Sequence, residues 1–263
     1  MMLRLKQRHL WGSVLLWVLI ALSGCQVPGT AAPTTVIIVR NAQGTPLAGV
    51  GSGPTTAPVT PTPAPSLVQN GSFAFEWTNG WQRDTGSTMT GQNVTEVITT
   101  SEGSSGKAVR LVHDGTNYLA IYQTIPISST NVSISAKINP SAETPCKGIL
   151  ASCTGQAGLI VTLHGANPAP GKELGQILYL YPGSDPDLRQ TSTGTSRFVF
   201  LSQGWQNINI ANLRQEIING LPSVNPTAVK TIQIMIVAGS RGSCDPGKCY
   251  AEVQATDIQV TAK

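Results

Sequence analysis

The chain has 263 residues, of which 40% are hydrophobic, 5% aromatic and only 11% charged, and its formal net charge is +4. Three of the seventeen basic residues, Arg4, Lys6 and Arg8, lie at the very start, which leaves fourteen basic against thirteen acidic residues beyond them. A chain so nearly balanced has no basic run of the kind that binds nucleic acid, so we expect no nucleic-acid partner. Its surface must consist largely of uncharged polar residues, which suits an extracellular protein.

The first 24 residues have the pattern of an export signal. The basic residues precede an apolar run from Trp11 to Leu22 that contains no charge. Because a membrane-spanning helix needs roughly 20 apolar residues, a retained transmembrane anchor is the weaker alternative. The run ends in Leu22-Ser23-Gly24-Cys25, which resembles the lipobox of bacterial lipoproteins. The resemblance implies a signal peptide over residues 1–24, a diacylglyceryl group on the thiol of Cys25, and a lipid-anchored protein exposed on the outside of the cell envelope.

Residues 25–65 differ in composition from the rest of the chain. They are rich in Pro, Thr, Ala and Gly, a composition that buries no core and favours extended, polyproline-like chain. From Ser66 onward, short runs with alternating apolar residues are separated by Gly, Asn, Asp and Ser. We therefore expect a disordered, lipid-anchored stalk over residues 25–65 and one folded domain over residues 66–263, which is long enough for a sizeable core.

The folded part has an all-β pattern. Period-two alternation and β-branched runs predict strands over residues 94–99, 108–113, 118–125, 132–138, 159–163, 176–181, 197–201, 206–210, 231–238 and 251–260. One short helix is predicted over residues 213–219, with Asn212 as its N-cap and Gly220 just past its end. About ten strands in one domain favour two packed antiparallel sheets, a jelly-roll β-sandwich. No repeat period is visible, which argues against propellers and solenoids.

Four cysteines other than Cys25 occur as two close pairs. They are Cys146 with Cys153 and Cys244 with Cys249. For an exported protein we expect disulfides, most simply the two local pairs, although spacing alone leaves cross-pairing open. Zinc is the alternative for four cysteines, but neither pair has the tight spacing of a zinc knuckle.

Short motifs across the folded part resemble the galactose-binding-like jelly rolls, a group that includes many carbohydrate-binding modules. The motifs are Leu67-Val68-Gln69-Asn70-Gly71-Ser72-Phe73 with Trp81 after it, Tyr122-Gln123-Thr124-Ile125-Pro126-Ile127, Gly204-Trp205-Gln206-Asn207-Ile208 and Ala255-Thr256-Asp257-Ile258-Gln259-Val260. The resemblance implies a sandwich that binds carbohydrate. Because the same sandwich also hosts modules that bind protein or lipid, it supports the fold more than the function.

The resemblance also implies one structural calcium ion as a cofactor. In several such modules the N-terminal segment and an acid of the last strand supply oxygen ligands, and the matching positions here are Ser72, Glu76 and Asp257. This chain departs from the usual pattern, because Ala74 follows Phe73 and the acid comes only at Glu76. The alternative is that Glu76 is a surface acid and that neighbouring residues satisfy Asp257.

A carbohydrate site needs an aromatic platform and planar polar groups. Period two places Tyr118 with Tyr122 on one face of their strand, and Tyr179 with Tyr181 on one face of theirs, so the two pairs can pave a sheet. The alternative is that both pairs pack in the core with only their hydroxyl groups reaching water. Trp77 lies in a polar setting that favours exposure.

The loop after Tyr181 contributes Asp185, Asp187 and Arg189, which can hold hydroxyl groups or a carboxylate, although such a loop can equally be a solvated turn.

Catalytic signals are weak in this sequence. The settings of His113 and His164 contain no Gly-x-Ser-x-Gly or His-Glu-x-x-His motif, so we name no catalytic residue. Three functions remain. The first is a non-catalytic surface module that binds carbohydrate. The second is a structural or adhesive envelope lipoprotein that binds a protein partner, and the third, less favoured, is a glycan-processing enzyme.

Overall fold

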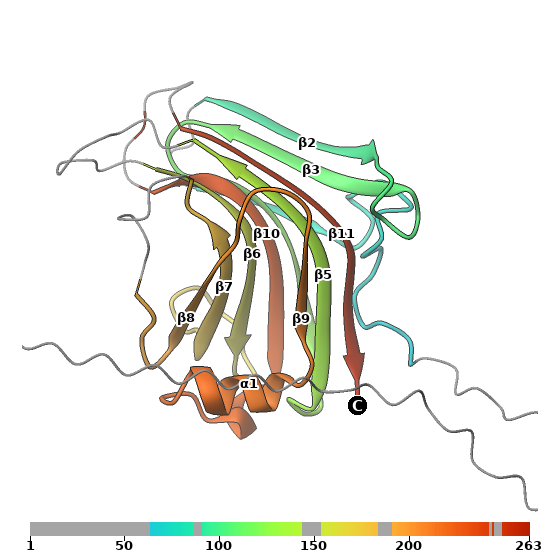
Figure 1. The fold of residues 1–263 in the computed structure, drawn as a ribbon. Coiled ribbons are helices and arrows are strands. Elements are labelled where there is room, and N and C mark those ends of the chain that lie inside the picture. The colour runs from blue at the N-terminus through green and yellow to red at the C-terminus, as the bar shows by residue number, and fades with distance from the viewer. Residues whose placement is uncertain (1–63, 87–90, 144–153, 184–190, 242–243, 245–248) are drawn as a thin grey trace, which may run out of the picture. The chain divides into compact units, whose positions relative to one another are not determined.

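The structure is a computed structural model that describes residues 64–86, 91–143, 154–183, 191–241, 244 and 249–263. All of them belong to the compact unit Pro61–Lys263, and the other unit, Met1–Thr60, lies outside them. The expected signal peptide, the Cys25 expected to carry the lipid and nearly all of the expected stalk are therefore outside the described residues. The described residues form a jelly-roll β-sandwich of two sheets with one α-helix at one end (Figure 1).

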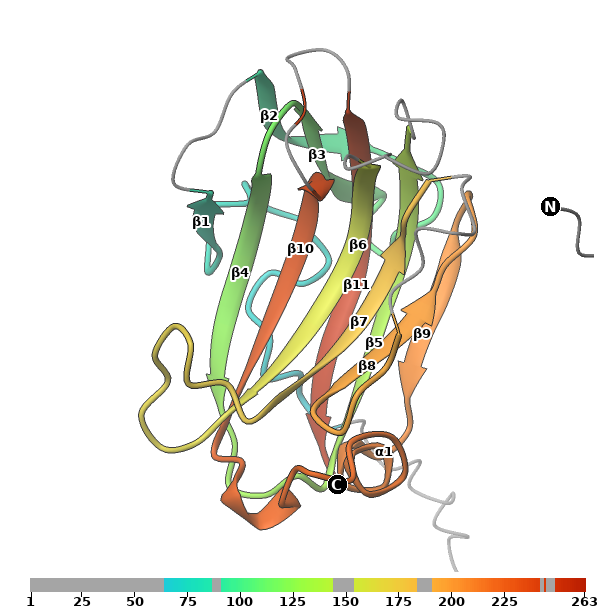
Figure 2. The same cartoon turned by 90° about the vertical axis from the view of Figure 1, so that its left-hand side faces the viewer.

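The first sheet has six strands in the order β1-β4-β10-β6-β7-β8, which Figure 2 shows from its outer face. Their bounds are β1 Gln82–Thr85, β4 Tyr118–Pro126, β10 Thr231–Arg241, β6 Thr154–His164, β7 Gly175–Tyr181 and β8 Ser196–Phe200. Neighbouring strands are antiparallel except β7 and β8, which are parallel. The expected antiparallel sandwich is confirmed, with β7 and β8 as the parallel exception among the described strands. Parallel neighbours need a crossover of a dozen or more residues, and the segment between Tyr181 and Ser196 is long enough for one.

The second sheet has five antiparallel strands in the order β2-β3-β11-β5-β9. Their bounds are β2 Gln92–Thr99, β3 Lys107–Asp114, β11 Tyr250–Ala262, β5 Val132–Ala142 and β9 Gln206–Ile210. The pairing of β11 with β5 shifts register between Thr256 and Gln259. Within this bulge Asp257 has a φ of +52°, so the strand bends and its carboxylate is redirected.

The core lies between the sheets because residues alternate along each strand. On β5 the inward residues Val132, Ile134, Ala136 and Ile138 are buried, whereas the polar residues between them are only partly buried. The same alternation on β4, β6, β10 and β11 builds one continuous apolar cluster. Each fully buried large aliphatic side chain stabilises the fold by about 1.5–3 kcal/mol relative to an exposed one. Most outward positions are therefore left for binding, although Ala120, Leu178, Leu180 and Val237 on the six-stranded sheet form a second, smaller buried cluster.

The helix α1 (Leu213–Gly220) forms where the sequence predicts it and is one residue longer, because Gly220 belongs to its last turn. The side chain of Asn212 accepts a hydrogen bond from the backbone N–H of Gln215 at 3.3 Å, which caps the first turn. Leu213 and Ile217 are fully buried, so the helix covers one end of the core. The 3₁₀-helix η2 (Pro226–Ala228) follows. Neither helix of the described residues has the length and apolar character needed to cross a membrane.

All ten predicted strands are confirmed; nine lie within a strand of the structure, and the tenth, over residues 197–201, extends one residue past the end of β8 at Phe200. The sequence analysis missed β1, whose residues Gln-Arg-Asp-Thr contain no apolar side chain. Because β1 is an edge strand with exposed or partly buried residues, no alternation marks it.

Candidate functional site

The outer face of the six-stranded sheet contains a groove of about 510 Å³. Its lining comes from β1, β4, β10, β6 and β7 and from the connection between β6 and β7, residues 165–174. In Figure 2 this face points toward the viewer, and the connection lies beside the lower ends of β4 and β10. The groove is therefore built on strands, with a loop along one side.

Four polar side chains form one row across the groove. Thr124 of β4 lies opposite Gln233 of β10. Gln233 also lies opposite Thr162 of β6, which in turn lies opposite Gln176 of β7. Because neighbouring strands are about 4.8 Å apart, the row spans about 14 Å. Within the described part of the chain, neither glutamine side chain makes a hydrogen bond, so both amides face the groove with free donors and acceptors.

A row with apolar side chains lies beside this polar row. Tyr122 is opposite Met235, and Met235 is opposite Ile160. Each of the three lies two positions from the polar residue of its own strand, about 7 Å away, and each lines the groove. The groove thus presents an apolar strip next to a strip of hydrogen-bonding groups, an arrangement that matches a ligand with apolar faces and polar edges.

Tyr118 and Tyr122 lie on the groove side of β4, as period two predicts. The hydroxyl group of Tyr122 donates to Oε1 of Gln82 at 2.7 Å, and that of Tyr118 donates to Oδ2 of Asp84 at 3.1 Å. Both partners belong to β1, so this edge strand fixes the two rings. Burial raises the pKa of the Tyr118 hydroxyl, and the charge and hydrogen bond of Asp84 raise it further. Tyr118 therefore stays uncharged near neutral pH.

Tyr179 and Tyr181 face away from the groove. Tyr179 is only 8% exposed and packs in the main core, and alternation along β7 puts Tyr181 on the same side. Leu178 and Leu180 occupy the outward positions instead. This corrects the expectation that the two tyrosine pairs pave one face. Burial raises the pKa of Tyr179 to about 12, and the carboxylate of Glu216 adds to the effect.

Of the other expected ligand contacts, one set cannot be placed and Trp77 does not line the groove. Asp185, Asp187 and Arg189 fall outside the described residues. Trp77 is partly buried and packs against the main core, so it is less open than its polar neighbours suggest. The exposed aromatic of that segment is Phe75, at 66%, which the sequence analysis did not single out. The side chain of Asn70 holds the turn by donating to the carbonyl groups of Glu76 and Phe75, at 2.9 and 3.3 Å.

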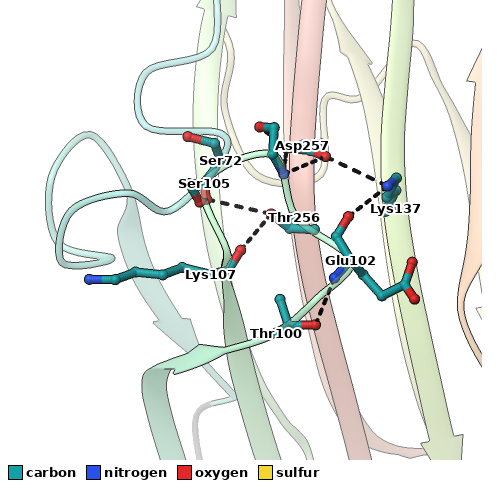
Figure 3. A network of polar contacts seen from close by, with 9 residues as sticks. Ser72, Thr100, Glu102, Ser105, Lys107, Lys137, Thr256 and Asp257 are labelled. Atoms are coloured by element: carbon teal, nitrogen blue, oxygen red, sulfur yellow. Dashed lines mark hydrogen bonds and ion pairs between the residues drawn. The ribbon is translucent and has the colours of Figure 1, made fainter.

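The carboxylate of Asp257 already has protein partners (Figure 3). Both oxygens accept a hydrogen bond from the backbone N–H of Ser104 at 3.0 Å, and the Ser104 hydroxyl also donates to Oδ1. The ammonium group of Lys137 lies 3.9 Å from Oδ2 and donates to the carbonyl of Glu102 at 2.6 Å. A positive charge thus stands beside the oxygen that a calcium ion would need.

The other two expected calcium ligands do not converge on that carboxylate. The carbonyl of Ser72 accepts hydrogen bonds from the hydroxyl groups of Ser105 and Thr256 (Figure 3). Glu76 is exposed, and its carbonyl is bound by Asn70. No cluster of three or more His, Cys, Asp or Glu residues that could hold a metal occurs among the described residues. The residues expected to bind calcium therefore do not fit the ion in this arrangement.

One of the two expected local disulfides is present, joining Cys244 and Cys249 with their Cα atoms 5.9 Å apart. The other pair, Cys146 and Cys153, lies outside the described residues. The bridge closes the connection between β10 and β11, and Thr116 fixes its start by donating to the carbonyl of Cys244 at 2.7 Å.

Most of the polar groups of the groove escaped the sequence analysis. Gln233, Thr162 and Gln176 each interrupt a strand that is otherwise largely apolar, and each stands at an outward position. A polar residue with apolar neighbours on both sides, such as Gln233 between Ile232 and Ile234, was the available signal. Their alignment into one row depends on strand order, which local alternation does not specify.

No protein-family model matches the chain, and no curated protein matches it. Among solved structures, it is similar to TmCBM61 in complex with beta-1,4-galactotriose, with 10% identity and a TM-score of 0.38 over 76% of this chain and 100% of that one. It is also similar to the family 11 carbohydrate-binding module of the cellulosomal cellulase Lic26A-Cel5E of Clostridium thermocellum, with 11% identity and a TM-score of 0.36 over 78% and 97%.

The enzymatically active domain of tailspike protein 4 of bacteriophage CBA120 matches with 10% identity and a TM-score of 0.42, over 74% of this chain but only 21% of that one. At these identities the likeness concerns the fold alone. The structural neighbours of the chain thus include carbohydrate-binding modules with a jelly-roll fold.

Proposed function

We propose that the chain is a non-catalytic carbohydrate-binding module whose binding site is the groove on the six-stranded sheet. The observation that carries the proposal is the pair of parallel strips, one with Tyr122, Met235 and Ile160 and one with free amide and hydroxyl groups. Sugar rings have apolar C–H faces and hydroxyl edges, so a chain of sugars lying across the strands contacts both strips at once. The 14 Å length of the polar row, roughly estimated from strand spacing, accommodates several hydroxyl contacts.

The polar groups of the groove suit hydroxyl recognition better than catalysis. A glycosidase needs two carboxylates facing each other across the scissile bond. Among the described lining residues the two carboxylates are Asp84, which accepts a hydrogen bond from Tyr118, and Glu173, which lies in the exposed connection between β6 and β7. The two carboxylates thus lie on different elements, and one of them is already hydrogen-bonded to a tyrosine. This arrangement supports a site that binds glycan without hydrolysing it.

The N-terminal sequence supports a location of this module at the cell envelope. Cleavage before Cys25 and acylation of its thiol would anchor the protein, with each buried methylene contributing about 0.8 kcal/mol. The linker over residues 25–65 would then hold the domain away from the membrane and present the groove to glycans outside the cell.

One observation favours a different function, a structural or adhesive lipoprotein that binds a protein partner. Phe75 is 66% exposed and stands beside a second depression of about 440 Å³. Exposed aromatic side chains of this kind are common at protein interfaces. In that case the partner contacts this end of the sandwich, and the groove has no role in binding.

The test is a glycan-array screen of the full chain in detergent, followed by calorimetric titration of the best ligand. Tyr122→Ala is expected to weaken binding about 30-fold, which corresponds to about 2 kcal/mol. Tyr250→Ala, which removes a partly buried tyrosine from the other sheet, is the matched control and should bind like the original chain. The proposal would be contradicted if the folded protein bound no glycan on the array, or if Phe75→Ala lost binding while Tyr122→Ala kept it.

A further inference from the structure

A buried histidine at the edge of the groove has no hydrogen-bonding partner. His164 is the last residue of β6, two positions beyond Thr162 on the same outward side, and its side chain lines the groove. Only 5% of the residue is exposed, and neither Nδ1 nor Nε2 has a hydrogen-bond partner. Buried polar side-chain atoms are normally hydrogen-bonded, and leaving them unpaired destabilises the folded state. Stability therefore does not explain why a histidine occupies this position.

The surroundings of His164 suggest what would satisfy it. The opposing residue on β10 is Thr231, and Pro168 and Pro170 of the β6–β7 connection line the same groove. Because the ring is buried on its other sides, its nitrogens can gain a hydrogen-bond partner only on the side that lines the groove. The torsion about the Cβ–Cγ bond of histidine is broad, so the ring can turn to offer a nitrogen to a group on that side.

The charges of the groove restrict what can enter. The carboxylates of the described lining are those of Asp84 and Glu173. No Lys or Arg occurs among these described lining residues. An anionic ligand would meet like charge with no cation to pair with. A neutral imidazole has one donor and one acceptor, and a hydroxyl group can serve as the partner of either.

Building on the proposed function, we infer that His164 hydrogen-bonds a hydroxyl group of the bound glycan and that the groove selects uncharged over acidic chains. The imidazole lies beside the polar row, two positions beyond Thr162 along β6, at the end of the strand where the β6–β7 connection begins. Its unsatisfied nitrogens are then a binding feature retained at the expense of stability, a trade-off common at functional sites.

The experiment compares three variants of the full chain in detergent, each titrated with the neutral glycan that binds best and each melted thermally. His164→Leu should bind at least tenfold more weakly and melt at the same or a higher temperature, because it removes unpaired polar atoms. His164→Gln, which keeps a donor and an acceptor, should stay within fivefold of the original affinity. His113→Leu is the matched control: its Nδ1 is 2.7 Å from Oδ1 of Asn93, away from the groove, so this variant should melt lower and bind normally.

A second measurement tests the charge selection with the original chain. The same glycan, with its primary hydroxyl groups oxidised to carboxylates, should bind at least tenfold more weakly. The inference would be overturned if His164→Leu bound glycan as tightly as the original chain, or if the oxidised glycan bound as tightly as the neutral one. Weaker binding by Tyr122→Ala would still show in either case that the groove binds glycan. If the folded original chain binds no glycan at all, the proposed function fails, and the inference fails with it.

Discussion

The outer faces of the two sheets are built by the same alternation but differ in how their polar side chains are satisfied. On the five-stranded sheet, Glu96, Arg110, Gln254 and Asn139 lie in register across four strands. Arg110 donates to Oε1 of Glu96 at 2.8 Å and to both carboxylate oxygens of Glu252 at 2.9 Å. These polar groups bind one another.

On the six-stranded sheet, the corresponding row of Thr124, Gln233, Thr162 and Gln176 faces a groove, and its glutamine amides bind no described side chain. Outward polarity alone therefore does not mark a binding face. A polar row whose members satisfy one another contributes to stability, whereas one left open beside apolar side chains is available to a ligand.

The largest effect on stability is expected at Arg110. The side chain of its partner Glu252 is only 15% exposed, so Arg110→Ala leaves a largely buried carboxylate without its counterion. We expect the free energy of unfolding to fall by about 3 kcal/mol, measured by urea denaturation. Glycan binding should be unchanged, because the network lies on the other sheet. A loss of binding without a loss of stability would reverse the assigned roles of the two faces.

The same network predicts a dependence on acid. Burial alone would raise the pKa of Glu252, but hydrogen bonds from Arg110, Tyr250 and Gln254 outweigh it and hold the pKa at about 2. The folded-state pKa lies below the ordinary value of 4.5, so this stabilisation is present above pH 4.5 and is lost as the pH falls toward 2. With allowance for solvent screening, the loss is about 2 kcal/mol. In Glu252→Gln, unfolding measured between pH 5 and 2 should show a shallower decline, and an unchanged slope would contradict this account.

Two matched glutamines compare the faces directly. Gln254 donates to Oε1 of Glu252 at 2.9 Å, so Gln254→Leu should lower the free energy of unfolding by about 1 kcal/mol and leave glycan binding intact. Gln233 has no such partner, so Gln233→Leu should keep the stability and weaken binding several-fold. Denaturation and calorimetric titration of both variants measure the two effects. Equal stability losses would show that both amides have structural roles.

The smallest expected effect is that of calcium. Because Lys137 and Ser104 already engage the carboxylate of Asp257, neither added calcium nor a chelator should shift the melting temperature by more than about 1 °C, an effect well under 1 kcal/mol for a domain of this size. Lys137→Ala should lower it slightly. A clear rise in melting temperature with calcium would show that the ion displaces the ammonium group.

The sequence was informative about the fold because the strands alternate strongly and the helix has a clear N-cap at Asn212. It was less informative about the site. Tyr118 and Tyr122 were placed on one face by period two, but Tyr179 was assigned to the same kind of surface because alternation does not say which side of a strand is buried. The polar row depends on strands far apart in sequence, so its alignment appears only in the folded chain. Likewise, the partners of Asp257 come from a distant loop and from β5.

The central claim is that glycan binds the outer face of the six-stranded sheet. The most direct test is an NMR titration in which an oligosaccharide is added to the full chain in detergent and the side-chain amide signals are followed. The amide signals of Gln233 and Gln176 should shift, because both line the groove. Those of Gln254 and Asn139, which bind each other on the opposite face at 3.5 Å, should stay in place and serve as internal controls. Shifts at Gln254 and Asn139 with none at Gln233 and Gln176 would contradict the assignment of the binding face.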